Sequence, residues 1–179
     1  MSDPIIIEDY DLCWPEQFEL LRARLSRCLE TLAAAIEHVG STAVPRLAAK
    51  PIIDIDVLLK SGADLPEAIT RLEILGYKHR GDLGVAGREA FRAPSNDVPH
   101  HLYVHRPQSR EYIRHITFRN HLRANPEDAR AYERLKRTLA KDYRDDREAY
   151  NLAKTQFVEA ILRRVNATEH SSLASRIIA

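Results

Sequence analysis

The sequence predicts an α/β fold in which a core of strands and helices is followed by helices only. Between residues 15 and 32, apolar residues recur at spacings of three and four, which is typical of one buried helix face. The segments 33–39 and 51–59 lack this stripe, and the second is rich in β-branched residues, so both are predicted to be strands. After Pro107 the pattern becomes helical. A sheet is therefore expected in the first part of the chain.

Cap and turn residues place the other elements of the core. Between the first two strands, residues 42–49 include Pro45 and have room for only one or two helical turns. Asp64 as N-cap, Pro66 in the first turn and Gly76 at the end indicate a helix. Turn-forming residues separate three further short strands, which are predicted at 77–79, 88–92 and 100–104.

The last part of the chain is predicted to be helical. One helix is expected over 109–122, and an Asn-Pro pair at 125–126 begins a second region that extends to about Val165. A polar stretch at 142–148 interrupts its apolar stripe, so this region is either two helices or one bent helix. Its many charges, Lys136 among them, favour a solvated helix face over a nucleic-acid patch.

The length and the charge balance limit the possible organisation and partners. A chain of 179 residues has the usual size of one domain. We expect a single domain over 1–179, with the α/β core at 1–107, helices packed on it at 108–166 and a tail at 167–179. The formal net charge is only +1, so the chain lacks an overall field that attracts DNA or an anionic membrane. Any anion site must be local.

The sequence shows no sign of a membrane segment or of cysteine chemistry. No apolar run approaches the about 20 residues needed to cross a bilayer, and the N-terminus has no basic region followed by an apolar stretch. Cys13 and Cys28 lack the C-x-x-C spacing of redox and metal motifs. We therefore expect a soluble cytoplasmic protein that binds neither a polynucleotide nor a membrane.

Two carboxylates on the second predicted strand suggest a metal. Because side chains alternate along a strand, Asp54 and Asp56 face one side, and Ile55 faces the other. Two like charges about 7 Å apart are unfavourable unless a cation or polar groups compensate them. Oxygen ligands at this spacing suit Mg²⁺ or Mn²⁺.

A Gly-Ser turn just before the short helical segment suggests a phosphate. Glycine lets a phosphate approach the backbone at Gly40, and the Ser41 hydroxyl adds a donor. Lys50 lies beside the acid strand and either neutralises a phosphate or balances the two aspartates. Each motif alone is common, but the turn and the acid pair together favour a phosphate-and-metal site over a structural coincidence.

Other polar residues have two open interpretations. Arg88 is suited to phosphate by its planar guanidinium, or forms a salt bridge with a nearby acid. His101, and His38 beside the Gly-Ser turn, either contact substrate or metal, or are strand histidines with a structural partner. The glycine-rich stretch 81–87 is expected to be a hairpin or a mobile flap. The remaining histidines are predicted to be surface or packing residues, namely His79, His115, His121 and His170.

Several motifs together resemble one protein family. They are Trp14-Pro15-x-x-Phe18, HVGSTAVPRLAAKPIIDI from position 38, Arg80-Gly81-Asp82-x-Gly84-x-x-Gly87-Arg88-x-x-Phe91, His101-Leu102-Tyr103-Val104 and Phe118-Arg119-x-x-Leu122-Arg123-x-x-Pro126. In these the chain resembles the GrpB family, a branch of the DNA polymerase beta-like nucleotidyltransferase superfamily. The resemblance implies a nucleotidyltransferase-like mixed sheet flanked by helices, with a C-terminal helical extension.

The resemblance also implies roles for the candidate residues. Gly40 and Ser41 would hold the phosphates of a nucleoside triphosphate, and Asp54 and Asp56 would bind the Mg²⁺ or Mn²⁺ that assists transfer of a nucleotidyl group. Active members of the superfamily usually supply a third carboxylate from a later strand, and no such acid is evident here. Tyr103 replaces a second histidine of the family pattern, which weighs against a zinc site on that strand.

Two functions follow as expectations. The first is a metal-dependent nucleotidyltransferase acting on a small molecule or a protein acceptor, with Lys50, Arg88 and His101 contacting substrate. The alternative is an inactive ligand-binding or accessory module, since related domains occur fused to dephospho-CoA kinase. The missing third acid favours the alternative, and a fold-level resemblance alone does not establish activity.

Overall fold

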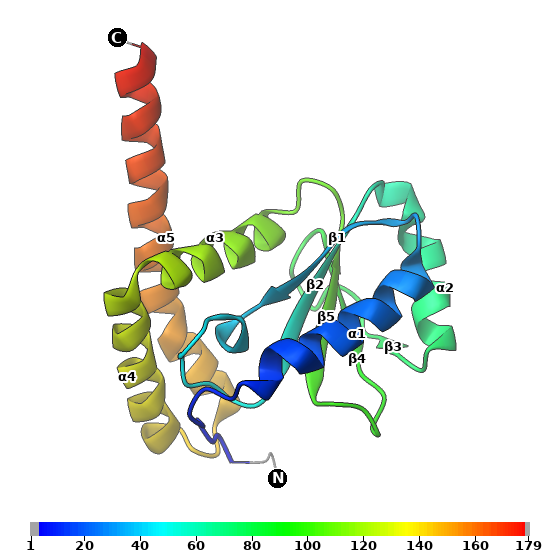
Figure 1. Cartoon of the computed structure of the whole chain (residues 1–179), viewed down its shortest axis with the longest axis horizontal. Coiled ribbons are helices and arrows are strands. Elements are labelled where there is room, and N and C mark those ends of the chain that lie inside the picture. The colour runs from blue at the N-terminus through cyan, green and yellow to red at the C-terminus, as the bar shows by residue number, and fades with distance from the viewer. Residues whose placement is uncertain (1–3, 178–179) are drawn as a thin grey trace.

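The computed structural model describes residues 4–177, with side chains described through residue 168. Within that part of the chain, a five-stranded sheet has the order β1-β2-β5-β4-β3 (Figure 1). Its strands are β1 (Ala33–Val39), β2 (Ile53–Leu59), β3 (Lys78–His79), β4 (Arg88–Arg92) and β5 (His100–His105). β2 and β5 are parallel, whereas the other neighbours are antiparallel. The sheet is therefore mixed, and the predicted α/β class is confirmed.

Two helices, α1 (Cys13–Leu29) and α2 (Leu65–Ile74, preceded by the short helix η2, Gly62–Asp64), form a core with one face of the sheet. Leu25 of α1, Ile55 of β2 and Leu102 of β5 are fully buried in this core. The apolar stripe of α1 thus packs as the sequence predicted. Because side chains alternate along β2, Asp54 and Asp56 lie on the opposite face of the sheet.

Three further helices, α3 (Arg110–Ala124), α4 (Pro126–Asp142) and α5 (Arg147–Ile177), gather on the side of the molecule away from α2 (Figure 1). The helical region after residue 125 is therefore two helices, since the chain turns at residues 143–146. α5 continues to Ile177, past residue 166, where the sequence predicted the helices to end. Among the described helices, none has the length and apolar composition needed to cross a membrane.

The Gly-Ser turn leads into η1 (Ser41–Ala43), a single turn of 3-10 helix. After it, Val44 and Leu47 pack against Leu122 of α3 and Tyr132 of α4 in a second apolar core. This contact brings the C-terminal helices to the end of β1. The space between these helices and the polar face of the sheet is where the candidate site lies.

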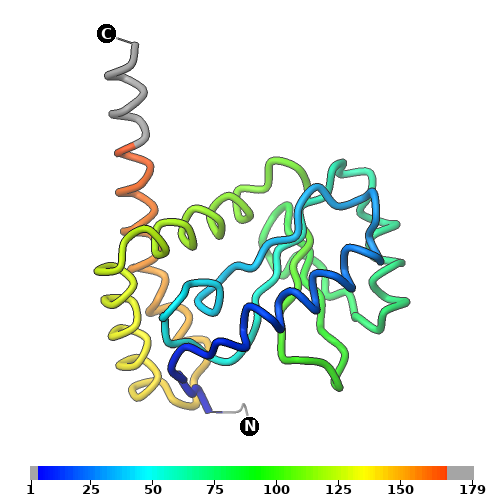
Figure 2. Tube along the Cα trace, viewed as in Figure 1, coloured from blue at the N-terminus to red at the C-terminus, as the bar shows by residue number. Residues whose placement is uncertain are grey.

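The N-terminal segment joins parts of the chain that are distant in sequence (Figure 2). The Ile5 amide donates to the Arg144 carbonyl in the α4–α5 loop at 2.8 Å. Glu8 forms an isolated antiparallel bridge with Ala49, just before Lys50. Residues 5–8 thus connect the loop before α5 with the segment before β2.

Candidate functional site

A cavity of about 710 Å³ lies against the polar face of the sheet. Asp54 of β2 is in register with His101 of β5, and Asp56 is in register with Tyr103. α3, α4 and α5 supply the other walls. Most of the residues that the sequence singled out line this cavity, namely Gly40, Ser41, Lys50, Asp54, Arg88 and His101. The two that do not line it are His38 and Asp56, and each has a structural reason, given below.

Asp54 is the carboxylate that the cavity exposes. Its side chain is 31% exposed, and its Oδ1 lies 2.8 Å from Nδ1 of His101. Nε2 of His101 lies 3.2 Å from a guanidinium nitrogen of Arg147 on α5. A guanidinium only donates, so Nε2 accepts, and Nδ1 carries the hydrogen that is donated to Asp54. His101 therefore fixes the orientation of Asp54 and connects it to α5.

Gly40 is required by its close approach to Asp54. Its φ is 71° and its ψ is −168°, a backbone conformation that is essentially restricted to glycine. A Cβ at this position would lie 2.1 Å from Oδ2 of Asp54. Two physical constraints therefore require glycine at this position: the backbone angles, and the space that the Asp54 carboxylate occupies.

Arg88 faces the cavity from β4 and stacks on an aromatic ring. Its guanidinium carbon lies 4.7 Å from the ring centroid of Tyr103. Two acids close to Arg88 in sequence have other partners, because Glu89 pairs with His79 and Asp97 pairs with Arg24. Within the described chain, Nε of Arg88 is buried without a hydrogen-bond partner. This residue is therefore available to a ligand.

The cavity is rich in cations that come from the C-terminal helices. Besides Lys50 and Arg88, the basic residues that line it are Arg114, Lys136, Arg147 and Lys154, against the carboxylates of Asp54 and Glu111. Burial, together with the nearby positive charges, lowers the pKa of Lys136 to about 7 and that of Lys154 to about 8. A bound anion would relieve this repulsion.

The predicted solvent exposure of Lys136 is wrong. The sequence placed it on a solvated helix face, but it is only 2% exposed, and its ammonium donates to the carbonyl of Ala48. The correction arises because α4 packs against the segment that follows η1, and Lys136 lies on the side of α4 that borders the cavity. Other charges of α4, such as Arg134 and Lys141, are exposed as predicted. Charge content alone gave no signal for this burial.

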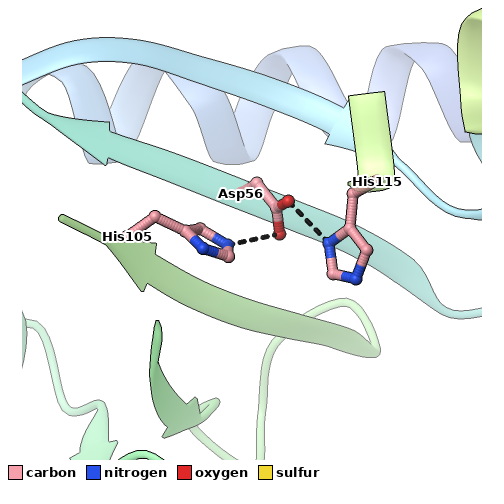
Figure 3. A group of neighbouring side chains, drawn as sticks. All are labelled: Asp56, His105 and His115. Atoms are coloured by element: carbon pink, nitrogen blue, oxygen red, sulfur yellow. Dashed lines mark hydrogen bonds and ion pairs between the residues drawn. The ribbon is translucent and has the colours of Figure 1, made fainter. Parts of the chain in front are cut away.

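Asp56 is held in a buried cluster beside the cavity (Figure 3). It is fully buried, with Oδ2 2.7 Å from Nδ1 of His115 and Oδ1 3.2 Å from Nε2 of His105. Burial by itself raises the pKa of a carboxyl, but the contacts with the two histidines outweigh it and lower the pKa of Asp56. The two aspartates thus share a face but have different surroundings.

His115 was predicted to be a surface or packing residue, and the structure gives it another position. It lines the cavity from α3 and bridges Asp56 and Glu111, with Nε2 3.1 Å from Oε1 of Glu111. Burial opposes its protonation, but the two carboxylates raise its pKa to about 9. The only sequence signal was the four-residue spacing of Glu111 and His115, which puts both on one helix face.

His38 lies on the other face of the sheet. Its ring stacks on Phe18 of α1 with centroids 4.7 Å apart, and its Nε2 is 3.0 Å from Oγ1 of Thr42. Alternation along β1 explains this position, because Val39 rather than His38 faces the cavity. Thr42, the partner of His38, lines the cavity.

The burial of His38 predicts a pH dependence of stability. Burial lowers its pKa to about 4, from the usual value of about 6.5 for a histidine side chain. Its contribution to stability is therefore complete above about pH 6.5 and is lost as the pH falls toward 4, by up to about 3 kcal/mol. Replacing His38 with glutamine should remove this part of the pH dependence. Urea unfolding of both proteins at pH 7 and pH 4.5 tests it, and an equal loss in both would contradict the assignment.

The remaining histidines and the glycine-rich stretch have structural surroundings. His79 pairs with Glu89 at 2.8 Å, and His121 pairs with Asp128 at 2.7 Å. The side chain of His170 lies outside the described residues. Residues 81–87 connect the antiparallel strands β3 and β4, as in the predicted hairpin.

The mixed sheet, the Gly-Ser turn and the cavity define an α/β protein with a cation-lined cavity beside an acidic strand. The chain belongs to the GrpB family, whose model, described as GrpB protein, matches residues 4–164. It is 37% identical to the UPF0157 protein BH1888 of Halalkalibacterium halodurans, over 92% of this chain and 84% of that protein. The crystal structure of the conserved protein GrpB from Enterococcus faecalis is 35% identical, with a TM-score of 0.81 over 89% of this chain and 96% of that chain.

Other similar proteins differ in length or are more distant. The UPF0157 protein YqkA of Bacillus subtilis is 33% identical over 84% of this chain, which spans only 44% of YqkA. A dephospho-CoA kinase of Mycolicibacterium paratuberculosis is 35% identical over 77 residues, 41% of this chain and 19% of the kinase. Cid1 poly(U) polymerase, solved with MgATP, is 15% identical over 75% of this chain and 44% of that chain, with a TM-score of 0.49. This last likeness is too slight to support a conclusion.

Proposed function

We propose that the cavity binds a nucleoside triphosphate with Mg²⁺ or Mn²⁺, and that the protein transfers the nucleotidyl group to a small molecule or a protein side chain. The observation that carries the proposal is the meeting of the Gly-Ser turn, the exposed carboxylate of Asp54 and several cations in one cavity. A volume of about 710 Å³ is in the range of small-molecule sites. The net charge of +1 argues against a polynucleotide acceptor.

Each residue of the cavity has a proposed task. The backbone at Gly40 and the hydroxyl of Ser41 would bind phosphate oxygens, while Lys50 and Arg88 would neutralise their charge. His101 would keep Asp54 oriented. In the reaction, an acceptor atom forms a bond to the α-phosphorus, the bond to the bridging oxygen breaks, pyrophosphate leaves, and the acceptor proton passes to solvent. Such a transfer depends mainly on positioning and charge neutralisation.

The proposed metal fits the two aspartates unequally. Mg²⁺ prefers oxygen ligands, and Asp54 presents a partly exposed carboxylate beside the place proposed for the phosphates. The metal would supply charge neutralisation there. Asp56 remains a proposed ligand from its position on the same face, but its contacts are the imidazole nitrogens of His105 and His115. This surrounding is not the oxygen-only set that Mg²⁺ prefers.

A second function is favoured by one specific observation. β5, the parallel neighbour of the acid strand, presents His101 and Tyr103 to the cavity where a third carboxylate would be expected. We therefore keep, as the alternative, a module that binds a phosphorylated ligand without turnover. The partial match to a dephospho-CoA kinase is compatible with an accessory role beside such an enzyme.

The first test is a thermal-stability titration with the four ribonucleoside triphosphates, with and without Mg²⁺ or Mn²⁺. Binding at a hundredfold excess over Kd should stabilise the wild type by about 2.7 kcal/mol. Asp54→Asn should lose the metal-dependent part of this stabilisation, because its cavity carboxylate is gone. The matched control, Asp142→Asn, changes an exposed aspartate at the end of α4 and should respond as the wild type does.

The outcomes separate the two functions. Metal-dependent binding with release of pyrophosphate on addition of an acceptor supports the transferase. Binding that persists without metal and without nucleotide consumption supports the accessory module. If no nucleotide stabilises the wild type, the proposed site is wrong. If Asp54→Asn keeps the metal-dependent stabilisation, Asp54 is not the metal ligand.

A further inference from the structure

We infer that Asp56, His105 and His115 form a binding site for a divalent first-row transition ion such as Zn²⁺. This site shares Asp56 with the ligands proposed above for Mg²⁺ or Mn²⁺, but it does not depend on nucleotide binding. It draws one ligand each from β2, β5 and α3, which no local sequence motif connects (Figure 3).

The distances within the cluster suit a metal ion. One ligand atom from each of the three residues lies within 4.8 Å of the other two. Asp56 Oδ1 is 3.2 Å from His105 Nε2, and Asp56 Oδ2 is 2.7 Å from His115 Nδ1. Ligands at about 2.1 Å from a tetrahedral ion are about 3.4 Å from one another. Only small side-chain adjustments would therefore bring the three groups around one ion.

Two atoms of the cluster are buried without a hydrogen bond. Oδ1 of Asp56 and Nε2 of His105 have no hydrogen-bond partner in the described chain, although they face each other at 3.2 Å. Both residues have 0% exposure. A buried polar atom without a partner is costly, and such atoms in folded proteins usually have an explanation. An ion between the two atoms would satisfy both of them.

In each histidine, the ring nitrogen that would not bind the ion already has a polar partner. His105 Nδ1 lies 3.0 Å from the hydroxyl of Ser109, and His115 Nε2 lies 3.1 Å from Glu111. Glu111 as a carboxylate accepts, so His115 donates from Nε2. A metal ion would displace the proton between Nδ1 and Asp56 and bind the nitrogen lone pair in its place. Histidines that bind metals in proteins are commonly fixed in this way by a second partner. The cluster therefore has both the ligands and their supports.

Access and ligand type decide which ion fits. His115 lines the cavity and its side chain is 26% exposed, whereas Asp56 and His105 are closed off from solvent. An ion would enter from the cavity, and its remaining coordination position would face the cavity. Two imidazoles with one carboxylate suit zinc, iron and cobalt, whereas Mg²⁺ prefers oxygen ligands alone.

The test uses the full chain after treatment with a chelator and contains no nucleotide. Titration with Co²⁺ should give visible absorption bands that saturate at one ion per chain. Zn²⁺ should displace the bands, and a hundredfold excess of Mg²⁺ should not. His115→Gln and His105→Gln should each weaken Co²⁺ binding at least about tenfold. His115 lies on the cavity wall, so its variant should keep the wild-type far-ultraviolet circular dichroism.

The matched controls are His79→Gln and His121→Gln, because each removes a histidine that pairs with a single carboxylate elsewhere. Both should bind Co²⁺ as the wild type does. The inference is overturned if the wild type takes up no stoichiometric Co²⁺ or Zn²⁺, or if folded His115→Gln binds unchanged. In those cases the cluster is a buried ion pair without a metal. Because no nucleotide is present and Asp54 is unchanged, neither result decides whether the cavity binds a nucleotide. Co²⁺ or Zn²⁺ binding would only remove Asp56 from the ligands proposed for Mg²⁺.

Discussion

Replacing Gly40 with alanine should lower the free energy of unfolding by about 3 kcal/mol and abolish the phosphate binding that we propose for the turn. The new Cβ would lie 2.1 Å from Oδ2 and 2.9 Å from Cγ of Asp54, so the turn or the carboxylate must move. The backbone at Gly40 also has angles that only glycine adopts without strain. Backbone strain and overpacking each cost about 1–3 kcal/mol.

The chain offers a control that separates the two causes. Gly81 and Gly84 have φ values of +72° and +78°, but a Cβ at either position would meet nothing within 4 Å. Alanine at either position should lower the free energy of unfolding only by the backbone strain of a positive φ, about 1–2 kcal/mol. Chemical unfolding of the three variants compares them directly. If Gly40→Ala is no more destabilised than Gly84→Ala, the close approach of the turn to Asp54 is not a constraint.

Replacing Arg119 with methionine should cost about 3 kcal/mol of stability. Its Nη1 donates to Oε2 of Glu37 at 2.6 Å and to the carbonyl of His38 at 2.8 Å, and its side chain is only 8% exposed. These bonds hold α3 against the end of β1, next to the Gly-Ser turn. Loss of one partner from a buried pair leaves unpaired polar groups, which costs several kcal/mol, and the partial exposure of Glu37 reduces this figure.

An exposed arginine provides the comparison. Arg164 on α5 pairs with Asp128 at 3.0 Å, but its side chain is 61% exposed. Arg164→Met should therefore cost less than about 1 kcal/mol. Unfolding in urea would measure both variants under the same conditions. Similar losses for Arg119→Met and Arg164→Met would show that the buried contacts of Arg119 do not anchor α3.

The part of the site that the sequence predicted is local in the chain. Gly40, Ser41, Lys50 and Asp54 belong to one segment that runs from a strand through a turn to the next strand, so their proximity follows from chain connectivity. His101 joins this segment through the pairing of β2 with β5, which places it in register with Asp54. The alternation of side chains, applied to β1, would have separated His38 from the turn residues. Strand alternation, rather than nearness in sequence, was the better guide.

The part that the sequence missed comes from helices that pack on the sheet. Arg147 and Lys154 lie on α5 and carry the charge pattern of an ordinary solvated helix. Lys136 shows the same ambiguity, because burial of a lysine depends on what packs over its helix. His115 reaches Asp56 across 59 positions of sequence. None of these contacts follows from local spacing, since they depend on how α3, α4 and α5 are oriented.

The sequence by itself determined the α/β class, the family, the acid strand and the turn before it, because periodicity, β-branched content and glycine act over a few residues. The tertiary structure alone decided that Asp54 and Asp56 have different surroundings. Asp54 opens to a cavity between cations, whereas Asp56 is enclosed by two histidines from β5 and α3. The physical reason is that a strand fixes only which face a side chain takes. The solvation and the partners on that face depend on the elements that cover it.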